Sequence, residues 1–526
     1  MRTIRITITM SGRYVWRVIV KLTPKVASGI FSLQNLYRQY LKCRRNKRNT
    51  LNALQFEFNA EWNLAALAVE LHQKTYVAKR AIGFVVAKPK LREIVAADFS
   101  DRIVHHILVD TLEAIFEPQF IYDSYACRQN KGTHKAVARV EQFIRQLSVN
   151  AQPSYFLQLD IHNFFINIDK NILLGLIYKR TRDHNLRWLA REVIFINPQQ
   201  DMLLKGDSQL FKRLPAHKSL LNAPVGKGLP IGNLSSQFFA NVYLNELDQF
   251  VKHSLKCSHY VRYCDDFILL DNSKARLEQF KGKIEQFLTE RLLLRLNPRY
   301  HAVLPVSNGI NYLGYIIHRE YRLVRKRVVS NLQEKLTELL PQVSCLDNVG
   351  ILRLKYDYPL LERLHSVLAS YLGHFKHANS YRLIESVFKH FSELGYFFEL
   401  KWLNNGSPQL VPLFNFKSVA GGIGSQYGYY MSCFKGSLLF FQVGYYYEFY
   451  AELPSEVVSL LKLRRLQRSS RNAYYGFPCN KESEYLSKIL DLGYSVVIIL
   501  ETESYLGRVK HRLPVVKLFK QGLSHE

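Results

Sequence analysis

The chain has 526 residues, which is enough for three or four domains with separate hydrophobic cores. Apolar residues make up 48% of the sequence and charged residues 22%, and this balance excludes a largely disordered protein. The 72 Lys and Arg residues outnumber the 43 Asp and Glu residues, and the net charge of +29 indicates a polyanionic partner such as nucleic acid.

The cysteines and the apolar runs bear on the compartment. Seven cysteines without any Cys-x-x-Cys pair argue against a zinc ribbon or a disulfide scaffold and are typical of a reducing cytoplasm. The chain has no run of about 18 apolar residues, and its first 25 residues lack the apolar centre of a signal peptide. We therefore expect a cytoplasmic protein without a membrane partner.

The first part of the chain is predicted to be mostly helical. Residues 1–29 are expected to form an N-terminal extension, and residues 30–80 favour helices, with a basic run at Lys42–Arg48. A solvated helix end or a flexible arm explains this run equally well. A hairpin is predicted at 84–94, and the apolar positions of Asp101–Phe116 recur at helical spacing.

The predicted hairpin carries three cations, Lys88, Lys90 and Arg92. Cations in this position can neutralise the phosphates of a nucleotide or of a template. A solvated hairpin face is an equally good explanation when the three residues are considered alone.

Carboxylates end two predicted strands in the middle of the chain. Phe156–Asp160 is a strand, and Tyr260–Leu270 has the pattern of two short strands with Asp265 and Asp266 at the tight turn between them. Taken alone, an Asp-Asp pair is more typical of an exposed turn. Asp160 beside that pair would form an all-oxygen site for two Mg²⁺ ions, because a bound cation offsets the repulsion between ionised carboxylates.

The remaining elements follow in chain order. We expect a helix at Leu234–Val251, a strand at Asn311–Ile317, a mainly helical region at 328–400, a helix at Ser483–Leu492 and a buried strand at Ser495–Leu500. A Gly-rich change of composition at Asn405–Gly428 marks a domain boundary.

Several blocks, in this order, resemble a reverse transcriptase. They read Leu159-Asp160-Ile161-His162-Asn163-Phe164-Phe165, Gly228-Leu229-Pro230-Ile231-Gly232-Asn233-Leu234-Ser235-Ser236-Gln237 and Tyr263-Cys264-Asp265-Asp266, supported by the stretches Asp123–Arg128 and Tyr312–Tyr315. The resemblance covers roughly residues 30–400 and implies an α+β, right-hand polymerase fold. It places fingers and an antiparallel palm sheet at 30–325, a helical thumb at 326–404 and a Gly-rich linker at 405–431.

The resemblance also implies roles for individual residues. The catalytic residues are Asp160, Asp265 and Asp266, which with Ile161 bind two Mg²⁺ ions, or Mn²⁺ in their place. The residues implied to bind the nucleotide are Lys88, Arg92, Phe165, Ile231, Gly232 and Gln237. Those implied to bind nucleic acid in this part of the chain are Lys90, Arg128, Lys131 and Thr133.

The form of the second block narrows the resemblance. Intron-type enzymes usually have Pro-Gln-Gly followed by Ser-Pro, whereas this chain has Pro230–Asn233 and Ser236-Gln237, which is similar to the enzymes of diversity-generating retroelements. The stretch Ser370–Phe375 is similar to that group as well. Those enzymes copy a template-repeat RNA into cDNA with errors at adenines. Ile231 stands where other polymerases place a Gln, and its side chain cannot donate a hydrogen bond to the nucleotide.

This resemblance implies a set of partners and a source. The partners are template RNA, primer, cDNA and dNTPs, and an accessory protein of the retroelement is a further candidate. The protein would be cytoplasmic and encoded by a bacterium or a phage. Two alternatives stay open: another bacterial reverse transcriptase, of the phage-defence or retron type, and a non-catalytic scaffold that binds RNA.

A second resemblance concerns the tail. Leu438–Phe449 resembles the first, mismatch-reading domain of MutS, and implies a small α/β domain at 432–526. That family has Asp after the Gly and then Phe-x-Glu, where this chain has Tyr445, Tyr446 and Glu448. Tyr446 and Glu448 are therefore expected to contact nucleic acid. Mismatch reading, general nucleic-acid or partner binding, and a purely structural module remain alternatives.

Overall fold

The computed structural model describes residues 4–7, 17–20, 29–45, 50–88, 90–148, 152–198, 202–299, 302–414, 421–466 and 473–520. The chain forms two compact units: Met1–Leu313 with Ile317–Arg319, and Gly314–Ile316 with Glu320–Glu526. The predicted extension at 1–29 and the end of the basic run lie mainly outside the described residues. In that extension, β1 (Ile4–Thr7) pairs with β2 (Arg17–Val20) in an antiparallel ladder.

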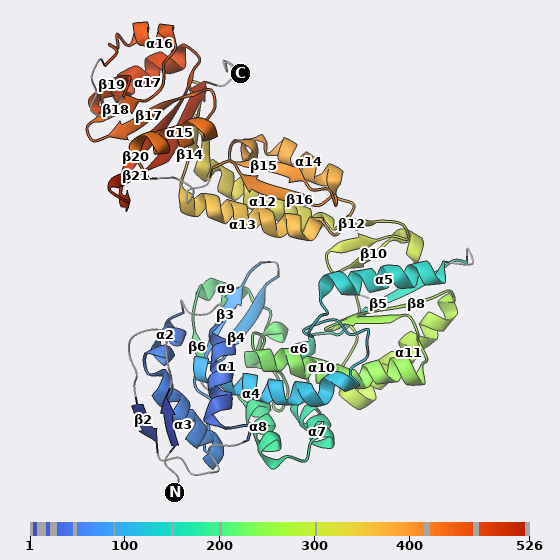
Figure 1. Ribbon diagram of the computed structural model, residues 1–526. Coiled ribbons are helices and arrows are strands. Elements are labelled where there is room, and N and C mark those ends of the chain that lie inside the picture. Colours follow the sequence, from blue (N-terminus) through green and yellow to red (C-terminus); the bar gives the residue numbers. More distant parts are fainter. Residues whose placement is uncertain are drawn as a thin grey trace. The chain divides into compact units, whose positions relative to one another are not determined.

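The first unit begins with a helical layer. It consists of α1 (Leu33–Arg44), α2 (Leu51–Phe58), α3 (Ala60–Gln73) and α4 (Phe99–Phe116). Ser32 caps α1 by accepting a hydrogen bond from the backbone of Asn35. A small sheet of order β4-β3-β6 stands beside this layer, formed by β3 (Ala81–Val86), β4 (Arg92–Ala96) and β6 (Met202–Leu204). The β3–β4 pair is the predicted hairpin (Figure 1).

The first unit also contains a four-stranded sheet of order β7-β8-β5-β9. Its strands are β5 (Tyr155–Asp160), β7 (Tyr260–Tyr263), β8 (Asp266–Asp271) and β9 (Val303–Pro305). The pairs β5–β8, β7–β8 and β5–β9 are antiparallel, as expected for a palm. Helices α5 (Thr133–Leu147) and α11 (Lys274–Leu292) pack against the sheet.

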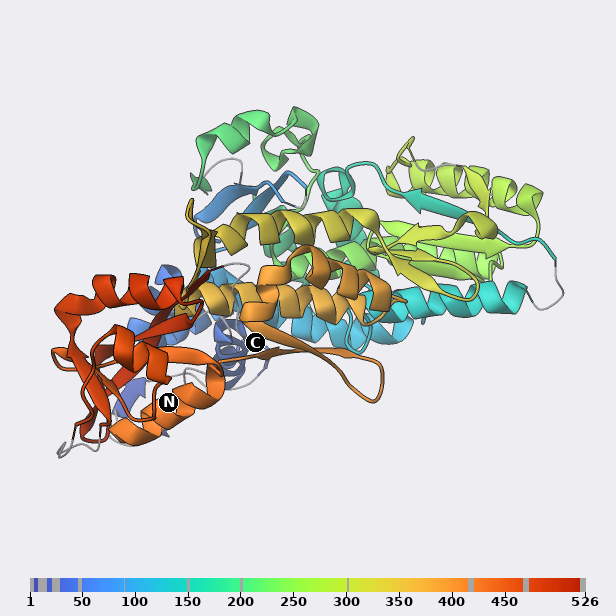
Figure 2. The ribbon, with the colours of Figure 1, turned by 90° about the horizontal axis from the view of Figure 1, so that it is seen from above.

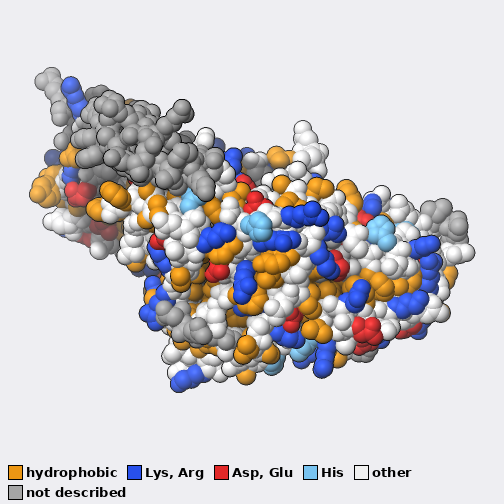
Figure 3. Space-filling view, turned by 90° about the horizontal axis from the view of Figure 1, so that it is seen from below, with side chains coloured by type: hydrophobic (Ala, Val, Ile, Leu, Met, Phe, Trp, Pro, Cys, Tyr) orange, Lys and Arg blue, Asp and Glu red, His pale blue; other side chains and the backbone are white. Residues whose placement is uncertain are grey.

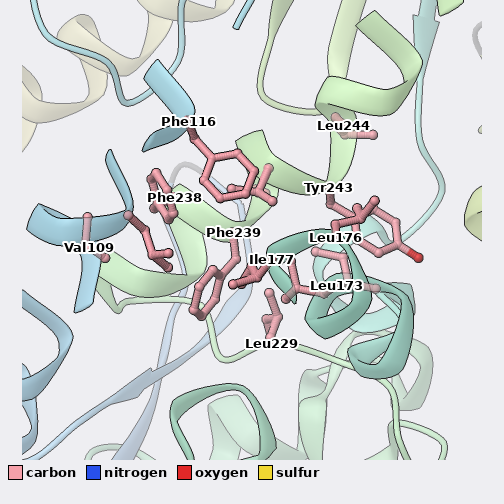
Figure 4. Close-up of a cluster of buried hydrophobic side chains, with 14 of the residues drawn as sticks. Val109, Phe116, Leu173, Leu176, Ile177, Leu229, Phe238, Phe239, Tyr243 and Leu244 are labelled. Atoms are coloured by element: carbon pink, nitrogen blue, oxygen red, sulfur yellow. The ribbon is translucent and has the colours of Figure 1, made fainter. Parts of the chain in front are cut away.

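Helix α10 (Leu234–Gln249) passes through the core of this unit and continues as a π-helical turn at Phe250–Ser254. Its side chains Phe238, Phe239 and Tyr243 pack against residues of α4, of α7 (Lys170–Arg180) and of the 228–232 loop (Figure 4). Twelve of its sixteen residues are buried, so the helix predicted at Leu234–Val251 is a core element. At the start of α10, Asn233 Oδ1 accepts a hydrogen bond from the Ala97 N–H at 3.0 Å.

Further elements of the first unit are α6 (Phe164–Asn167), α8 (His184–Phe195) and α9 (Ser208–Arg213). The chain then continues through β10 (Ile310–Tyr312), β11 (Tyr315–Ile317) and β12 (Arg322–Val324), so the predicted strand at Asn311–Ile317 is two short strands.

After β12, the second unit contains helices α12 (Lys326–Val343) and α13 (Tyr358–Phe375), which lie side by side (Figures 1 and 2). Helix α14 (Tyr381–His390) and the antiparallel pair β15 (Phe398–Trp402) and β16 (Pro408–Pro412) follow.

The region 328–400 is mainly helical, as predicted, but a hairpin of β13 (Ser344–Leu346) and β14 (Ile351–Lys355), which was not predicted, separates α12 from α13. Leu352 and Leu354 are buried by this hairpin, which explains why the segment leaves the helix.

That hairpin belongs to a seven-stranded sheet of order β13-β14-β21-β20-β17-β18-β19. The other strands are β17 (Ser437–Val443), β18 (Tyr446–Phe449), β19 (Tyr475–Pro478), β20 (Ser495–Leu506) and β21 (Val509–Lys520). Helix α17 (Glu482–Asp491) packs on the sheet, in the place expected for the tail helix, and α16 spans Ser455–Leu460.

The prediction of a linker at 405–431 is wrong for its described part. The stretch contains β16 and most of helix α15 (Ile423–Cys433), whose Tyr427 and Tyr430 are buried against Phe441 of the seven-stranded sheet. The glycines at 421–424 precede this helix, and Gly422 adopts a φ of 102° at its N-cap.

The surface agrees with the composition. On the face in Figure 3, Lys and Arg side chains are spread widely over the described surface and are more frequent than Asp and Glu. Among the described helices, none combines the length and the apolar character needed to cross a membrane.

Candidate active site

The three candidate carboxylates come together at one end of the four-stranded sheet. Asp160, the last residue of β5, lies directly opposite Asp266, the first residue of β8. Directly opposed residues of an antiparallel pair share a face, so both side chains project from the same side of the sheet. Tyr263 also pairs with Asp266, which leaves Cys264 and Asp265 as a two-residue hairpin turn. Cys264 has a φ of 58°, the left-handed conformation that such turns require.

Burial and mutual repulsion raise the pKa values of this cluster. Burial raises the pKa of Asp160, and burial together with the charge of Asp160 raises the pKa of Asp265. The pKa of Asp266 rises to about 7, mainly through burial and then through the charges of Asp160 and Asp265. A site that makes its own carboxylates costly to ionise favours a cation that would offset their charge.

Two amides orient the carboxylates. The Gln158 amide donates to both carboxylate oxygens of Asp266, at 3.0 and 3.3 Å, and lowers its pKa in part. The Asn297 side chain donates to Asp160 Oδ2 at 2.7 Å, while its backbone N–H donates to the Asp160 carbonyl at 2.8 Å. Sequence reasoning missed both residues. Asn297 could have been found from its place just before Pro298, whereas Gln158 carries no motif.

The cations of the β3–β4 hairpin extend towards this cluster. Lys90 lowers the pKa values of Asp160 and Asp266 by its charge, and Arg92 acts in the same way on Asp265. Lys88 is exposed on the same hairpin. The hairpin therefore supplies positive charge beside the carboxylates, where phosphate groups of a nucleotide would need it.

The loop at 228–232 lies between α6 and β4. Backbone hydrogen bonds join Gly228 N to the Ile168 carbonyl at 2.9 Å and Leu229 N to the Phe165 carbonyl at 2.8 Å. On the other side, the Val95 N–H donates to the Ile231 carbonyl at 2.8 Å. The structure thus brings the half-buried side chains of Phe165 and Ile231 onto adjoining segments.

Gly232 is required by this packing. Its φ is 121°, and a Cβ atom there would lie 2.8 Å from Ile94 Cγ2. The close approach is thus to strand β4, whereas the sequence pattern implied an approach to the nucleotide. One residue later, Asn233 Oδ1 accepts from the Ala97 N–H at 3.0 Å, and Gln237 is exposed on the first turn of α10.

The residues expected to bind the template, Arg128, Lys131 and Thr133, lie in different environments. The Arg128 side chain is only 6% exposed, because its guanidinium pairs with Glu117 and donates to the carbonyls of Ile121 and Ser124. This is a structural environment, so the expected template contact by Arg128 is not supported. The Lys131 ammonium donates to the Tyr122 carbonyl at 2.8 Å, and Thr133 Oγ1 bonds the Tyr263 hydroxyl at 3.3 Å, which places the helix start of α5 beside the carboxylate hairpin.

Arg262 lies beneath the hairpin turn and was not predicted as a site residue. Its side chain and that of Asp248 on α10 are both fully buried and form an ion pair at 2.6 Å. The same guanidinium donates to the Cys264 carbonyl at 3.0 Å. A charged group in the interior next to the carboxylate turn is a candidate for a role in arranging it.

In the second unit, Tyr446 is 51% exposed and Tyr445 is 90% exposed, at the turn between β17 and β18. The carboxylate of Glu448 accepts a hydrogen bond from the Tyr450 hydroxyl. The Gly444 N–H donates to Glu501 Oε1 at 3.2 Å, which holds the turn against β20. The expected aromatic contact residue is therefore accessible, while Glu448 is engaged within the module.

Within the described parts of the chain, no group of three His, Cys, Asp or Glu side chains has the arrangement of a metal site. The donor set of Asp160, Asp265 and Asp266 nonetheless consists only of carboxylate oxygens, which suit Mg²⁺, and burial, the largest cause of their raised pKa values, makes these carboxylates costly to ionise without a cation. The residues present therefore fit a hard divalent cation.

Two stretches of the chain match known families. Residues 77–317 match the family "Reverse transcriptase (RNA-dependent DNA polymerase)", and residues 422–523 match "MutS domain I". The first match contains the whole carboxylate cluster, the hairpin and the 228–232 loop. The second begins at the start of α15, about ten residues before the boundary expected at 432.

Known relatives are distant in sequence. Protein YkfC of Escherichia coli (strain K12) is 23% identical over 326 residues, covering 54% of this chain and 80% of that protein. The group II intron-encoded protein LtrA of Lactococcus lactis subsp. cremoris is 22% identical over 356 residues, and the chain spans 55% of its length.

Among solved structures, telomerase from Candida albicans with a fragment of telomeric RNA is 12% identical, with a TM-score of 0.35 over 60% of this chain and 55% of that one. The chain carries a reverse transcriptase domain homologous to group II intron-encoded proteins, followed by a MutS domain I.

Proposed function

We propose that this protein synthesises adenine-mutagenic cDNA from a template-repeat RNA for a diversity-generating retroelement, by two-metal nucleotidyl transfer. The observation that carries the polymerase part is the opposition of Asp160 and Asp266 across β5 and β8, with Asp265 in the adjoining turn. The observation that favours the retroelement is Ile231 in the loop beside Phe165.

In this proposal Asp160, Asp265 and Asp266 hold two Mg²⁺ ions, or Mn²⁺ in their place, and the Ile161 main chain is a further ligand. Bound divalent ions would polarise the triphosphate and favour ionisation of the primer 3′-hydroxyl. The protein's own part is to keep the carboxylates on one face of the sheet and to orient them through Gln158 and Asn297.

The hairpin and the loop provide the nucleotide site. Lys88 and Arg92 neutralise triphosphate charge, and Lys90 neutralises template phosphate beside the carboxylates. The Phe165 ring would lie under the sugar and exclude a 2′-hydroxyl.

Ile231 gives the site its low fidelity. Its backbone is fixed to Val95, so the loop is anchored while its side chain presents only apolar surface. An apolar side chain cannot reject a mispaired nucleotide through a hydrogen bond, so discrimination falls.

The C-terminal MutS domain I is proposed to contact nucleic acid through Tyr446. The ring is exposed and can stack on a base, although its hydroxyl disfavours full insertion between bases. The domain would then serve in place of, or together with, a basic accessory protein of the retroelement.

The runner-up is another bacterial reverse transcriptase, of the phage-defence or retron type, and a non-catalytic RNA scaffold comes third. To separate them, purified protein and an Asp265→Ala, Asp266→Ala variant are incubated with primed RNA, dNTPs and Mg²⁺, and the cDNA is sequenced. Errors concentrated opposite template adenines, in cDNA that the variant does not make, support the proposal. Accurate cDNA favours the runner-up, and no cDNA with cognate RNA and accessory protein favours the scaffold.

A further inference from the structure

Arg262 occupies the interior directly below the carboxylate turn. It stands in β7, three residues before Asp265, and its side chain has no exposed surface. Its Nε donates to Asp248 Oδ1 at 2.8 Å and its Nη2 donates to Asp248 Oδ2 at 2.6 Å, so the two planar groups face each other side-on. Asp248 belongs to the buried helix α10, and the guanidinium is thereby fixed in both position and plane.

The third corner of the guanidinium faces the turn. Nη1 donates to the Cys264 carbonyl at 3.0 Å and to Asn241 Oδ1 at 3.2 Å. Cys264 has a φ of 58°, a conformation that is unfavourable for a residue with a Cβ atom. The hydrogen bond from Arg262 therefore supports a turn conformation that its own sequence does not favour.

The carbonyl that Arg262 holds belongs to the peptide leading into Asp265. In a trans peptide the C=O and the N–H point in opposite directions, so fixing one fixes the other. The N–H of this peptide is that of Asp265, so the plane that Arg262 fixes is the one from which the Asp265 backbone continues. The direction in which the Asp265 side chain leaves the turn is thus coupled to the guanidinium through one rigid peptide plane.

The surrounding polar groups make this arrangement stiff. The Tyr260 hydroxyl donates to Asp248 Oδ1 at 2.8 Å, and Asn241 donates to the Ala126 carbonyl at 2.8 Å. The Arg262 backbone N–H donates to the Asp123 carbonyl at 3.0 Å. A buried network in which every member has a partner holds its groups in one geometry.

We propose that Arg262 is a positioning residue for the Asp265 carboxylate, which it aims at a divalent cation by holding the Cys264–Asp265 peptide. The inference rests on the proposed two-metal function. Lysine cannot replace the arginine, because an ammonium on a flexible stem cannot bond a carboxylate side-on and a carbonyl at a fixed angle at the same time.

Binding of Mn²⁺ to the full chain, measured by electron paramagnetic resonance, tests this role without requiring catalysis. We expect Arg262→Lys to weaken Mn²⁺ binding about 10- to 100-fold, the effect typical of residues that orient metal ligands. Steady-state kinetics of cDNA synthesis on the same samples should show a similar fall in kcat, with the KM for dNTP and the affinity for RNA unchanged. Asp265→Ala, which removes the carboxylate itself, serves as the reference for complete loss of its contribution to Mn²⁺ binding.

Two further variants guard against misfolding. The first is a triple variant that combines Arg262→Met, Asp248→Leu and Tyr260→Phe. It removes both buried charges together with the hydroxyl that bonds to Asp248, and protein interiors often tolerate such a replacement. This variant also loses the bond to the Cys264 carbonyl and should lose Mn²⁺ affinity to the same extent. Arg44→Lys is the matched control, because Arg44 forms a partly buried ion pair with Glu57 at 2.7 Å in the helical layer, and its Mn²⁺ affinity should be that of the wild type.

Wild-type Mn²⁺ affinity in either folded Arg262 variant would overturn the inference, and so would an equal loss in Arg44→Lys. Failure of the proposed function is distinguishable from both. A wild-type protein that binds Mn²⁺ but makes no cDNA removes the polymerase proposal, while the Mn²⁺ comparison among the variants still decides the role of Arg262.

Discussion

Replacing Asp266 with Asn should stabilise the metal-free protein at alkaline pH. In the folded chain the pKa of Asp266 is raised from 3.8 to about 7, chiefly by burial and then by the neighbouring carboxylates. A carboxyl group with a raised pKa favours folding while it is protonated. That contribution is complete below the unfolded pKa and is lost as the pH rises through the folded pKa. An Asn at this position stays neutral throughout and can still accept a hydrogen bond from Gln158.

The magnitude follows from the shift. About three pKa units at about 1.4 kcal/mol each give a ceiling of about 4 kcal/mol. The side chain keeps some contact with water, and Lys90 remains nearby, so the effect should be smaller than this ceiling. As the pH rises from 5 to 8.5, we expect the free energy of unfolding of the variant to increase by about 1 to 3 kcal/mol relative to that of the wild type. For a unit of this size the gain corresponds to a few degrees in melting temperature.

Calorimetry of the full chain in EDTA, at several pH values, measures this difference. Asp271→Asn is the matched control, because Asp271 ends the same strand but lies beside Arg276 at 3.5 Å. Adding Mg²⁺ at pH 8.5 should stabilise the wild type more than Asp266→Asn. Parallel pH dependences of the wild type and the Asn variant would refute the raised pKa of Asp266 in the folded chain.

Three further outcomes are expected. Ile231→Gln should raise fidelity opposite template adenines, and an unchanged error spectrum in sequenced cDNA would reject the fidelity role. Gly232→Ala should lower cDNA synthesis strongly, because its Cβ would lie 2.8 Å from Ile94 Cγ2 at a φ of 121°; full activity would show that the loop can shift. The logarithm of RNA affinity should fall with the logarithm of salt concentration by about 0.7 to 0.9 for each phosphate contacted, and a flat titration would contradict an electrostatic interface.

The position of the carboxylate hairpin could be predicted from the sequence, because its short motif lies at the ends of two strands. The carboxylate hairpin was expected from two short apolar strands around Asp265 and Asp266, and β7 and β8 lie there. Its pairing with β5 came from the family resemblance, since no local pattern states which strands meet.

The orienting residues could not be predicted in the same way. Gln158 is a polar residue inside a strand, and only the register of β5 against β8 shows that its amide reaches Asp266. For Arg128 and Arg262, the sequence did not show that the side chain is buried. Both belong to stretches typical of nucleic-acid enzymes, but each guanidinium is buried against a carboxylate, and burial depends on the tertiary fold.

The β13–β14 hairpin was missed for a different reason. Its alternating residues Ile351–Lys355 span only five positions, and long amphipathic helices flank them on both sides. An alternating apolar pattern this short is not recognised as a strand when the residues on both sides show helical periodicity.

The shared seven-stranded sheet has a consequence for how this protein could be divided or recombined. Strand β14 hydrogen-bonds β21 from Ile351↔Lys520 to Lys355↔Val516, so the terminal module is completed by a segment encoded about 70 residues before the module begins. A cut just before 422 would leave two unpaired strand edges, one on each fragment, and open edges of this kind invite self-association. The seven-stranded sheet is therefore built from two separate segments of the chain. A gene fusion that transfers the complete sheet must also carry residues 344–355.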